Sequence, residues 1–363
     1  MLQLDKVTKV FSTGAFGSAV FPAVRQVSFD ILPGQVTALI GESGSGKTTL
    51  GKMILRLESV SSGSIMFDGK DIAQLKHRGD LREYYRYVQG VFQDPFSSYN
   101  PIFRADRVFQ MVRDTYFSGV RSAEWHQKVE DAVQAVGLNP ADVLNKFTHQ
   151  LSGGQLQRLL IARALLLDLK LLIADEIISM LDASTRIDVL NLLADLKKRG
   201  LGVLFITHDL SLGNYISERA VILRRGIILE MGATEKVFSN PQHPYTKMLL
   251  ASVPRLHQKW EPLTESAAAS FEPAVMADGS PLPPAAVDAD TEKQRSRSSL
   301  DPLAGRAGRH FVVGPAGVGL PDIGARREKD LRLSEEVPPL VEVEEDHFAA
   351  VSEPAQPASH AAG

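Results

Sequence analysis

The sequence predicts an α/β fold whose core is a mostly parallel β-sheet. Short, almost continuously apolar runs recur along the chain, and segments with helical spacing separate them. Such runs are typical of parallel strands that are buried on both faces. Glycine-rich or charged segments follow several of the runs, at the strand ends where α/β sheets carry their chemistry. The runs are VTALI at 36–40, GVF at 90–92, LKLLIA at 169–174 and GVLFIT at 202–207.

The composition is that of an ordinary soluble globular protein, with 44% hydrophobic and 23% charged residues among 363. A formal net charge of −3 argues against binding nucleic acid through its phosphate backbone. The chain has no cysteine, which excludes disulfides, thiolate metal sites and thiol catalysis. The longest apolar stretch is interrupted by Arg163, Asp168 and Lys170, and charges lie where a signal peptide would be apolar. We therefore expect a cytosolic chain without a membrane span.

The composition changes near residue 257. Because no internal repeat suggests a second copy, we predict one folded domain over residues 1–257. More than half of the 20 prolines lie beyond this point, and the low-complexity segment 258–330 cannot build a core, so we expect it to be disordered. The tail, 331–363, contains a more ordered stretch, LSEEVPPLVEVEEDHF, in which we expect a small strand pair.

The segment GESGSGKT lies between the run at 36–40 and a helical pattern, TLGKMILRL. This is the G-x-x-x-x-G-K-[ST] loop in its strand–loop–helix context, and a flexible glycine-rich turn is the alternative. Its glycines let backbone N–H groups surround phosphate oxygens, and the following helix directs its positive end at the same anion. Lys47 is expected to reach the β- and γ-phosphates of ATP, and the Thr48 hydroxyl to bind Mg²⁺. The predicted ATP-binding residues are Gly41, Glu42, Ser43, Gly44, Ser45, Gly46, Lys47, Thr48 and Thr49.

The segment LSGGQ opens another helical pattern, QLQRLLIARALLL. Ser152 and Gln155 have the spacing of a capping box, which is a purely structural interpretation. A Ser-Gly-Gly helix start is also an anion site built from backbone donors and the helix dipole. Both interpretations can hold together, so the sequence predicts two phosphate-binding surfaces. The second consists of Leu151, Ser152, Gly153, Gly154 and Gln155.

Two adjacent acids, Asp175 and Glu176, end the apolar run LLIA. Neighbouring carboxylates repel each other, so a cation or a proton is expected to compensate them. His208 follows the run GVLFIT, and Gln93 follows the run GVF, so both lie at strand ends as well. Solvated acids and a structural histidine are the alternatives.

Together these motifs resemble the nucleotide-binding subunit of an ABC transporter. The P-loop GESGSGKT, the signature LSGGQLQR, the Walker B strand LLIADE, the D-loop SMLDAS and the histidine of ITHD have the family's order and spacing. The resemblance covers about residues 1–257. It implies a P-loop NTPase cassette with a small antiparallel β-subdomain, a helical subdomain at about 94–150 and an extension at about 232–257. It also implies that two cassettes enclose ATP, each closing its signature over the other's P-loop.

The resemblance assigns roles to the residues at the strand ends. Thr48, Gln93 and Asp175 are expected to hold Mg²⁺. Glu176 is expected to position or deprotonate the attacking water. His208 would bond the γ-phosphate and hold the water in line, and Gln93 would sense the metal and the nucleophile.

Near the D-loop the chain departs from the family pattern, although Asp182 is still expected to cross the interface between cassettes. Ile177 stands where a proline is usual, and Met180 stands where an alanine is usual. Neither change removes a catalytic group, so we expect hydrolysis to survive. A weakly hydrolysing regulatory cassette is the alternative.

An aromatic side chain near the N-terminus is expected to stack on the adenine. Phe11 is the candidate, and Phe16 and Phe21 in the following insert compete with it. Phe11 is equally compatible with the core of the small antiparallel sheet.

Further segments resemble the oligopeptide/dipeptide permease subclass. FQDPFSSYNP at 92–101 resembles its Gln-loop, and NPQHPYTKMLLASVP at 240–254 resembles the segment just after its core. A plain loop that leads into an amphipathic helix is the alternative for the second segment. The end of the chain is also similar, although the absence of cysteine excludes the iron–sulfur cluster that some members carry. The resemblance implies a peripheral subunit at the cytoplasmic face of the membrane that drives peptide import. Import of oligosaccharides, nickel chelates or other small solutes stays open.

The resemblance also implies partners. These are permease subunits on separate chains, a second cassette (a related chain more readily than a second copy) and, indirectly, an extracytoplasmic solute-binding protein. The segment 102–150 is expected to form a groove for a coupling helix of the permease. A soluble ABC ATPase acting on ribosomes or DNA would have tandem cassettes or a long heptad insertion, and the chain has neither.

Overall fold

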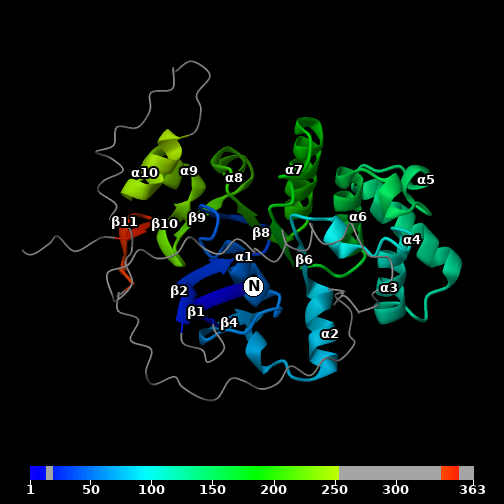
Figure 1. Cartoon of the computed structure of the whole chain (residues 1–363), viewed down its shortest axis with the longest axis horizontal. Coiled ribbons are helices and arrows are strands. Elements are labelled where there is room, and N and C mark those ends of the chain that lie inside the picture. Colours follow the sequence, from blue (N-terminus) through cyan, green and yellow to red (C-terminus); the bar gives the residue numbers. More distant parts are fainter. Residues whose placement is uncertain (14–18, 253–336, 351–363) are drawn as a thin grey trace, which may run out of the picture. The chain divides into compact units, whose positions relative to one another are not determined.

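The computed structural model describes residues 1–13, 19–252 and 337–350. Its larger sheet has eight strands in the order β11-β12-β10-β9-β3-β8-β7-β6 (Figure 1). The strands from β9 to β6 in this order run parallel, whereas β10, β12 and β11 are each antiparallel to their neighbour. The bounds are β3 (Val36–Ile40), β6 (Val88–Val91), β7 (Leu171–Asp175), β8 (Gly202–Thr207), β9 (Arg219–Arg224), β10 (Ile227–Ala233), β11 (Leu340–Glu344) and β12 (His347–Ala350).

The apolar runs predicted as strands form the middle of this sheet. VTALI and GVLFIT are β3 and β8 residue for residue, and all their residues are buried, as strands covered on both faces must be. The run at 169–174 forms β7, and the run at 90–92 overlaps β6. The predicted mostly parallel α/β core is confirmed.

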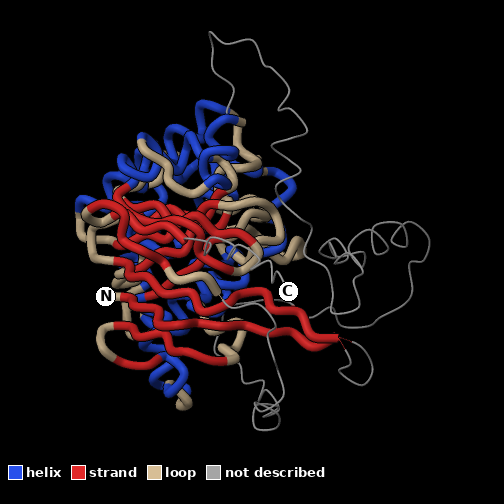
Figure 2. Tube along the Cα trace, turned by 90° about the vertical axis from the view of Figure 1, so that its left-hand side faces the viewer, coloured by secondary structure: helices blue, strands red, loops and turns tan. Residues whose placement is uncertain are grey.

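A second, antiparallel sheet has four strands in the order β2-β1-β4-β5. Its strands are β1 (Leu2–Thr13), β2 (Ala19–Ile31), β4 (Ser62–Phe67) and β5 (Lys70–Asp71), and the strands of both sheets are red in Figure 2. The buried face of this sheet shares one hydrophobic cluster with α1 (Lys47–Ile54) and with the larger sheet, through Leu4, Leu50 and Leu39 for example. The helix that follows β3 is therefore anchored by apolar contacts with both sheets.

A group of helices follows β6 and packs around a separate hydrophobic cluster that includes Phe109, Trp125 and Leu156 (Figure 1). It consists of α3 (Arg107–Tyr116), α4 (Ser122–Ala135) and α5 (Pro140–Val143), and α3 and α4 contact α6 (Gly153–Leu165). These helices lie within the range 94–150 expected for a helical subdomain. The remaining helices are α2 (Arg78–Tyr87), α7 (Ala183–Lys198), α8 (Leu210–Ile216), α9 (Thr234–Ser239) and α10 (Pro244–Ala251).

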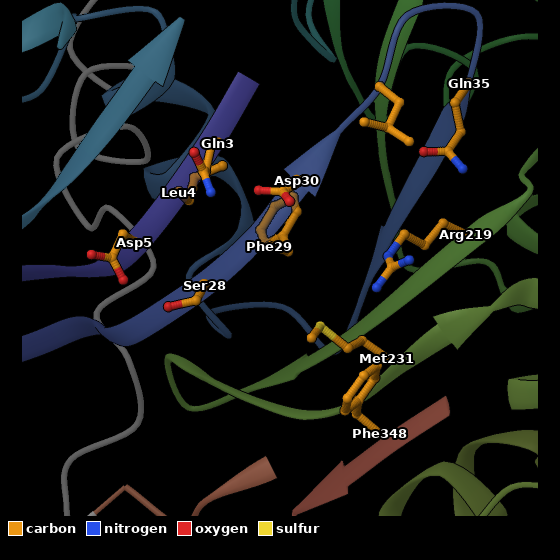
Figure 3. A pocket seen from close by; sticks show the side chains of 11 residues that line it. Gln3, Leu4, Asp5, Ser28, Phe29, Asp30, Gln35, Arg219, Met231 and Phe348 are labelled. Carbon is orange, nitrogen blue, oxygen red and sulfur yellow. The ribbon is translucent and has the colours of Figure 1, made fainter. Parts of the chain in front are cut away.

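The strand pair expected near the end of the chain is present as β11 and β12, and it extends the larger sheet. In the register, Met231 of β10 lies opposite Phe348, and Gly232 lies opposite His347. Gly232 permits this approach, because a Cβ there would lie 2.3 Å from the carbonyl oxygen of Asp346. We call residues 340–350 the C-terminal hairpin. Met231 and Phe348 line a cavity of about 380 Å³ to which β1 and β2 also contribute (Figure 3).

No helix within the described ranges is long and apolar enough to cross a membrane. Several sequence-based expectations lie outside the described residues. They concern Phe16, positions 253–257 of the extension, the low-complexity segment 258–330, and positions 331–336 and 351–363 of the tail.

Candidate functional site

The carboxyl ends of β3, β8, β7 and β6 lie side by side in the larger sheet. Their registers align the last residues of neighbouring strands: Ile40 with Thr207, Ile206 with Asp175, and Ala174 with Val91. The candidate residues therefore leave the sheet along one edge, with the P-loop after β3, His208 after β8, Glu176 after β7 and Gln93 after β6. Parallel strands concentrate their chemistry at this edge.

The P-loop, residues 41–48, turns tightly between β3 and α1. Gly44 and Gly46 have φ of 78° and 102°, a left-handed conformation that glycine adopts without a Cβ clash. Gly41 meets a second constraint, because a Cβ there would lie 2.1 Å from the carbonyl oxygen of Leu223 in β9. The glycines thus permit both the tight turn of the loop and its close contact with β9.

Lys47 begins α1 and turns its side chain back over the loop. Its ammonium donates to the carbonyl oxygens of Gly41 and Glu42, each at 2.8 Å, and the residue is only 5% exposed. Burial lowers the pKa of Lys47, whereas the charges of Glu176 and Asp175 act in the opposite direction. A cation beside a glycine-rich turn and a helix start is suited to bind phosphate.

Asp175, the last residue of β7, is 4% exposed. Burial raises the pKa of its carboxyl to about 6, while the Thr48 hydroxyl favours the ionised form. Its Oδ1 has no hydrogen-bond partner among the described residues. A buried carboxylate oxygen without a partner, next to a hydroxyl, fits a Mg²⁺ ion. Within the described ranges no three His, Cys, Asp or Glu side chains are grouped so that they could hold a metal ion together.

Glu176 is held in a strained backbone conformation. Its φ is 49°, and its N–H donates to the carbonyl oxygen of Ile206 in β8 at 3.0 Å. Its carboxylate Oε1 lies 3.1 Å from Nδ1 of His208. The Glu176 side chain is 19% exposed and that of His208 is 59% exposed. A partly shielded acid thus faces a histidine that is open to solvent, which is an arrangement able to hold a water molecule and a phosphate.

Gln93 lies just beyond β6 and is exposed, and its side chain makes no hydrogen bond within the described part of the chain. The neighbouring Phe92 carbonyl accepts a hydrogen bond from Nε2 of Gln157 in α6 at 3.2 Å. The Tyr99 hydroxyl donates to the Leu156 carbonyl of the same helix at 3.0 Å. The segment after β6 is therefore tied to α6, a link that the sequence analysis did not predict.

The signature, residues 151–155, forms the predicted capping box. The Gln155 N–H donates to Oγ of Ser152 at 3.2 Å, and the Ser152 N–H donates to Oε1 of Gln155 at 2.9 Å. Ser152 is exposed, and Gly153 and Gly154 are half-buried. Among the described residues no hydrogen bond or ion pair joins the signature to the P-loop. The second helix start is thus separate from the first.

Asp182 is the N-cap of α7. Its carboxylate accepts the Ser184 hydroxyl at 2.6 Å and the Thr185 N–H at 2.9 Å, and these hydrogen bonds hold the pKa of Asp182 well below its usual range. An aspartate directly before a helix indicates such a cap, which the sequence analysis missed. The two departures from the family pattern differ in environment, since Ile177 is 1% exposed and Met180 is 62% exposed.

The adenine-stacking candidates lie on the antiparallel sheet. Phe11 of β1 is half-buried and lies opposite Phe21 of β2, which is 42% exposed. The ammonium of Lys9 lies 4.8 Å from the centroid of the Phe11 ring. A cation therefore already lies over the Phe11 ring, and Phe21 is the more exposed of the two phenylalanines.

Two residues outside the predicted set approach the P-loop. Nε of Arg224 in β9 lies 3.4 Å from Oε1 of Glu42, and the Arg224 guanidinium lies 4.6 Å from the ring centroid of Tyr245 in α10. The sequence signal for Tyr245 is the HPY triplet within NPQHPYTKMLLASVP, which carries the resemblance to the permease subclass and also has the pattern of a loop before a helix.

The fold and the site together define a P-loop ATPase cassette. The family model "ABC transporter" matches residues 24–179, and the model "Oligopeptide/dipeptide transporter, C-terminal region" matches residues 229–281. Similar sequences include the oligopeptide transport ATP-binding protein OppF of Bacillus subtilis, which is 40% identical over a 250-residue alignment that covers 66% of this chain and 82% of that protein. The chain therefore belongs to the family of ABC transporter ATP-binding proteins, and it is an ATP-binding ABC-type ATPase.

Other relatives agree with this assignment. The oligopeptide transport ATP-binding protein AmiF of Streptococcus pneumoniae is 44% identical over 66% of this chain and 77% of its own length. A putative peptide import ATP-binding protein of Brucella ovis is 44% identical over 65% of this chain and 74% of its own length. Among solved structures, a dimeric ATP-binding cassette with bound ADP and phosphate is 26% identical, with a TM-score of 0.59 over 64% of this chain and 99% of that chain. A subunit of a Clostridium perfringens transporter complex is 27% identical, with a TM-score of 0.56 over 66% of this chain and 90% of that chain.

Proposed function

We propose that this chain is the ATP-hydrolysing subunit of a membrane ABC importer, located at the cytoplasmic face, that takes up peptides or a related small solute. The peptide cargo is supported by the names of similar proteins and by the match over residues 229–281. The observation that carries the proposed hydrolysis is the grouping of Lys47, Asp175, Glu176 and His208 at one edge of the sheet.

In the proposed mechanism, the Lys47 ammonium leaves the two loop carbonyls to which it donates and binds the β- and γ-phosphates of ATP instead. Thr48, Gln93 and Asp175 are the residues that would hold Mg²⁺, which supplies charge stabilisation to the transferred phosphoryl group when bound. The unpartnered oxygen of Asp175 supports this role.

Glu176 orients the attacking water and accepts its proton. The neighbouring His208 imidazole, 3.1 Å from the Glu176 carboxylate, holds the γ-phosphate and keeps the water in line. The left-handed backbone at Glu176 fixes the direction of the carboxylate, since the N–H of Glu176 is bonded to the neighbouring strand.

The signature completes the site of a second cassette. Ser152 is exposed at a helix start, where the dipole favours an anion, and it makes no hydrogen bond to its own P-loop within the described part of the chain. The similar dimeric cassette with ADP and phosphate supports this pairing. We infer that closure of two cassettes over ATP moves the permease subunits, and that phosphate loss reopens the pair. The second cassette is a related chain or another copy of this one.

The test measures phosphate release and nucleotide binding by the full chain. Wild type should hydrolyse ATP, Glu176→Gln should lose about 10²-fold or more in rate while it keeps nucleotide affinity, and Lys47→Ala should lose affinity. Glu124→Gln, an acid on α4 remote from these residues, is the matched control and should hydrolyse like wild type. Equal, near-zero rates for wild type and Glu176→Gln with intact binding would instead identify a regulatory cassette. Absence of nucleotide binding by wild type would refute the proposal.

A further inference from the structure

A buried glutamate–histidine pair anchors the C-terminal hairpin to β10. Glu230 of β10 and His347 of β12 are both 0% exposed, and Oε1 of Glu230 lies 2.6 Å from Nε2 of His347. Removing such groups from water is costly unless they are paired and hydrogen-bonded. The pair therefore needs further partners in its surroundings.

Glu230 finds these partners in the segment just before α10. Its carboxylate accepts the backbone N–H of Gln242 at 2.8 Å and that of His243 at 3.0 Å. One carboxylate thus joins three parts of the chain, namely β10, the C-terminal hairpin and the start of α10. If His347 is removed, the carboxylate loses the side chain that bonds it within the described ranges, and the start of α10 is then held only from the β10 side.

The start of α10 in turn positions Tyr245. Nδ1 of His243 accepts the Tyr245 N–H at 3.1 Å, and Tyr245 is 0% exposed. The ring lies 4.6 Å from the guanidinium of Arg224, and Nε of Arg224 lies 3.4 Å from the carboxylate of Glu42 in the P-loop. Burial raises the pKa of Tyr245, and the nearby charge of Glu42 raises it further. The Tyr245 hydroxyl makes no hydrogen bond of good geometry among the described residues, but the nearby Glu42 backbone acts to lower the pKa of Tyr245.

The C-terminal hairpin has several further contacts that hold it in place. Arg219 of β9 and Asp346 form an ion pair at 2.8 Å. Met231 and Phe348 lie next to each other on the wall of the cavity (Figure 3). The hairpin is therefore a firmly docked part of the sheet, and it can transmit its position to the segment that contacts Glu230.

We propose that Tyr245 is a positioning residue for ATP binding, and that the Glu230–His347 pair holds Tyr245 in place by docking the C-terminal hairpin. The Tyr245 ring fixes the Arg224 guanidinium, and Arg224 fixes Glu42 and the shape of the P-loop. This inference rests on the proposed function, in which the P-loop binds ATP. If the inference holds, α10 and the C-terminal hairpin contribute to nucleotide affinity through Arg224 and Glu42.

The first experiment measures the Kd of MgATP for the full chain by equilibrium binding. Tyr245→Leu removes the aromatic face and should weaken binding about three- to tenfold, whereas Tyr245→Phe keeps the face and should bind within about twofold of wild type. Tyr215→Leu, the same change at a tyrosine of α8 that is 63% exposed, is the matched control and should bind like wild type. Because Tyr245 acts on the loop that binds ATP, the turnover rate at saturating ATP should change less than the Kd.

The second experiment tests the buried pair. His347→Leu should weaken MgATP binding to a similar extent as Tyr245→Leu, and His347→Gln, which keeps a donor for Glu230, should restore most of the affinity. His126→Leu, on α4 with its side chain 68% exposed, is the control. The double variant Tyr245→Leu with His347→Leu should bind no more weakly than either single variant, because both act through one path.

The outcomes separate the inference from the proposed function. If wild type binds MgATP and Tyr245→Leu binds equally well, the positioning role is wrong and the proposed function stands. Fully additive losses in the double variant would show that the hairpin does not act through Tyr245. If wild type does not bind MgATP, the proposed function itself fails. Circular dichroism and thermal unfolding identify a variant that does not fold, and Tyr245→Phe and His347→Gln then carry the test.

Discussion

Gly41 controls how closely the P-loop approaches the neighbouring strand. It is the first residue after β3, and an added Cβ would lie 2.1 Å from the Leu223 carbonyl oxygen, which cannot move without disturbing β9. The P-loop itself would therefore have to shift. Since its backbone N–H groups must converge on phosphate, a small displacement reduces their fit to the anion.

We expect Gly41→Ala to weaken MgATP binding at least about tenfold and to lower the free energy of unfolding by about 1–3 kcal/mol, the usual cost of overpacking. Binding is measured with a fluorescent nucleotide, and stability by urea unfolding. Gly79→Ala is the matched control, because a Cβ there meets no atom within 4 Å. Equal affinities for the two variants would show that the loop tolerates the displacement.

For single residues of the candidate site, the sequence predicted which side chains are present but not their backbone conformations. The motifs place Asp175 at the end of one parallel strand and Lys47 and His208 beyond the ends of two others, and these strands end at one edge of the sheet. The left-handed φ of 49° at Glu176 has no sequence signal, since it depends on hydrogen bonds to neighbouring elements. The capping role of Asp182 does have a sequence signal, which is an aspartate directly before a helical pattern, but only its interface role was predicted.

Helix α6 combines a structural cap and a proposed recognition surface in one residue, Ser152. We expect Ser152→Ala to cost about 1 kcal/mol of stability through the lost cap. In the Glu176→Gln background it should also abolish dimerisation driven by ATP, which is measured by size-exclusion chromatography with light scattering.

The matched control is Asn139→Ala, which removes another helix cap, since Oδ1 of Asn139 accepts the Ala141 N–H at 3.2 Å. It should lose a similar amount of stability, about 1 kcal/mol, and keep dimerisation. If both variants dimerise equally with ATP, Ser152 acts only as a cap.

Strands were predictable where burial made them uniformly apolar. The runs that became β3 and β8 carry no charge, so their bounds were predicted to the residue. Strand β9, RAVILR, has the same apolar centre but an arginine at each end, and the sequence analysis passed over it. Each of its arginines forms an ion pair with another part of the chain: Arg219 with Asp346, and Arg224 with Glu42. Contacts of this kind depend on the tertiary structure.

For the whole molecule, the proposed attachment to a permease has a candidate surface after β6. Phe96, Ile102 and Phe103 are 51%, 78% and 48% exposed, although large apolar side chains are usually buried. Grouped exposed apolar side chains are typical of interaction sites. Ile102 and Phe103 lie at the start of the segment 102–150 for which a groove was predicted, and Phe96 lies just before it.

We expect Ile102→Asp to leave ATP hydrolysis by the isolated chain within about twofold of wild type, because an exposed substitution changes stability by only about 0.5 kcal/mol. The variant should bind less to membrane vesicles that contain the permease subunits, as measured by co-sedimentation. Leu32→Asp, at a leucine that is 50% exposed, is the control. Equal sedimentation of both variants would place the attachment surface elsewhere.

The pairing of β12 with β10 also sets the order in which the protein can fold during translation. About a hundred residues lie between the two strands, so at ordinary elongation rates the nascent chain carries an unpaired β10 for on the order of ten seconds. In that interval the outer edge of the sheet is available to other strands, and Glu230 lacks His347. The C-terminal hairpin thus covers a sheet edge that belongs to strands translated about a hundred residues earlier.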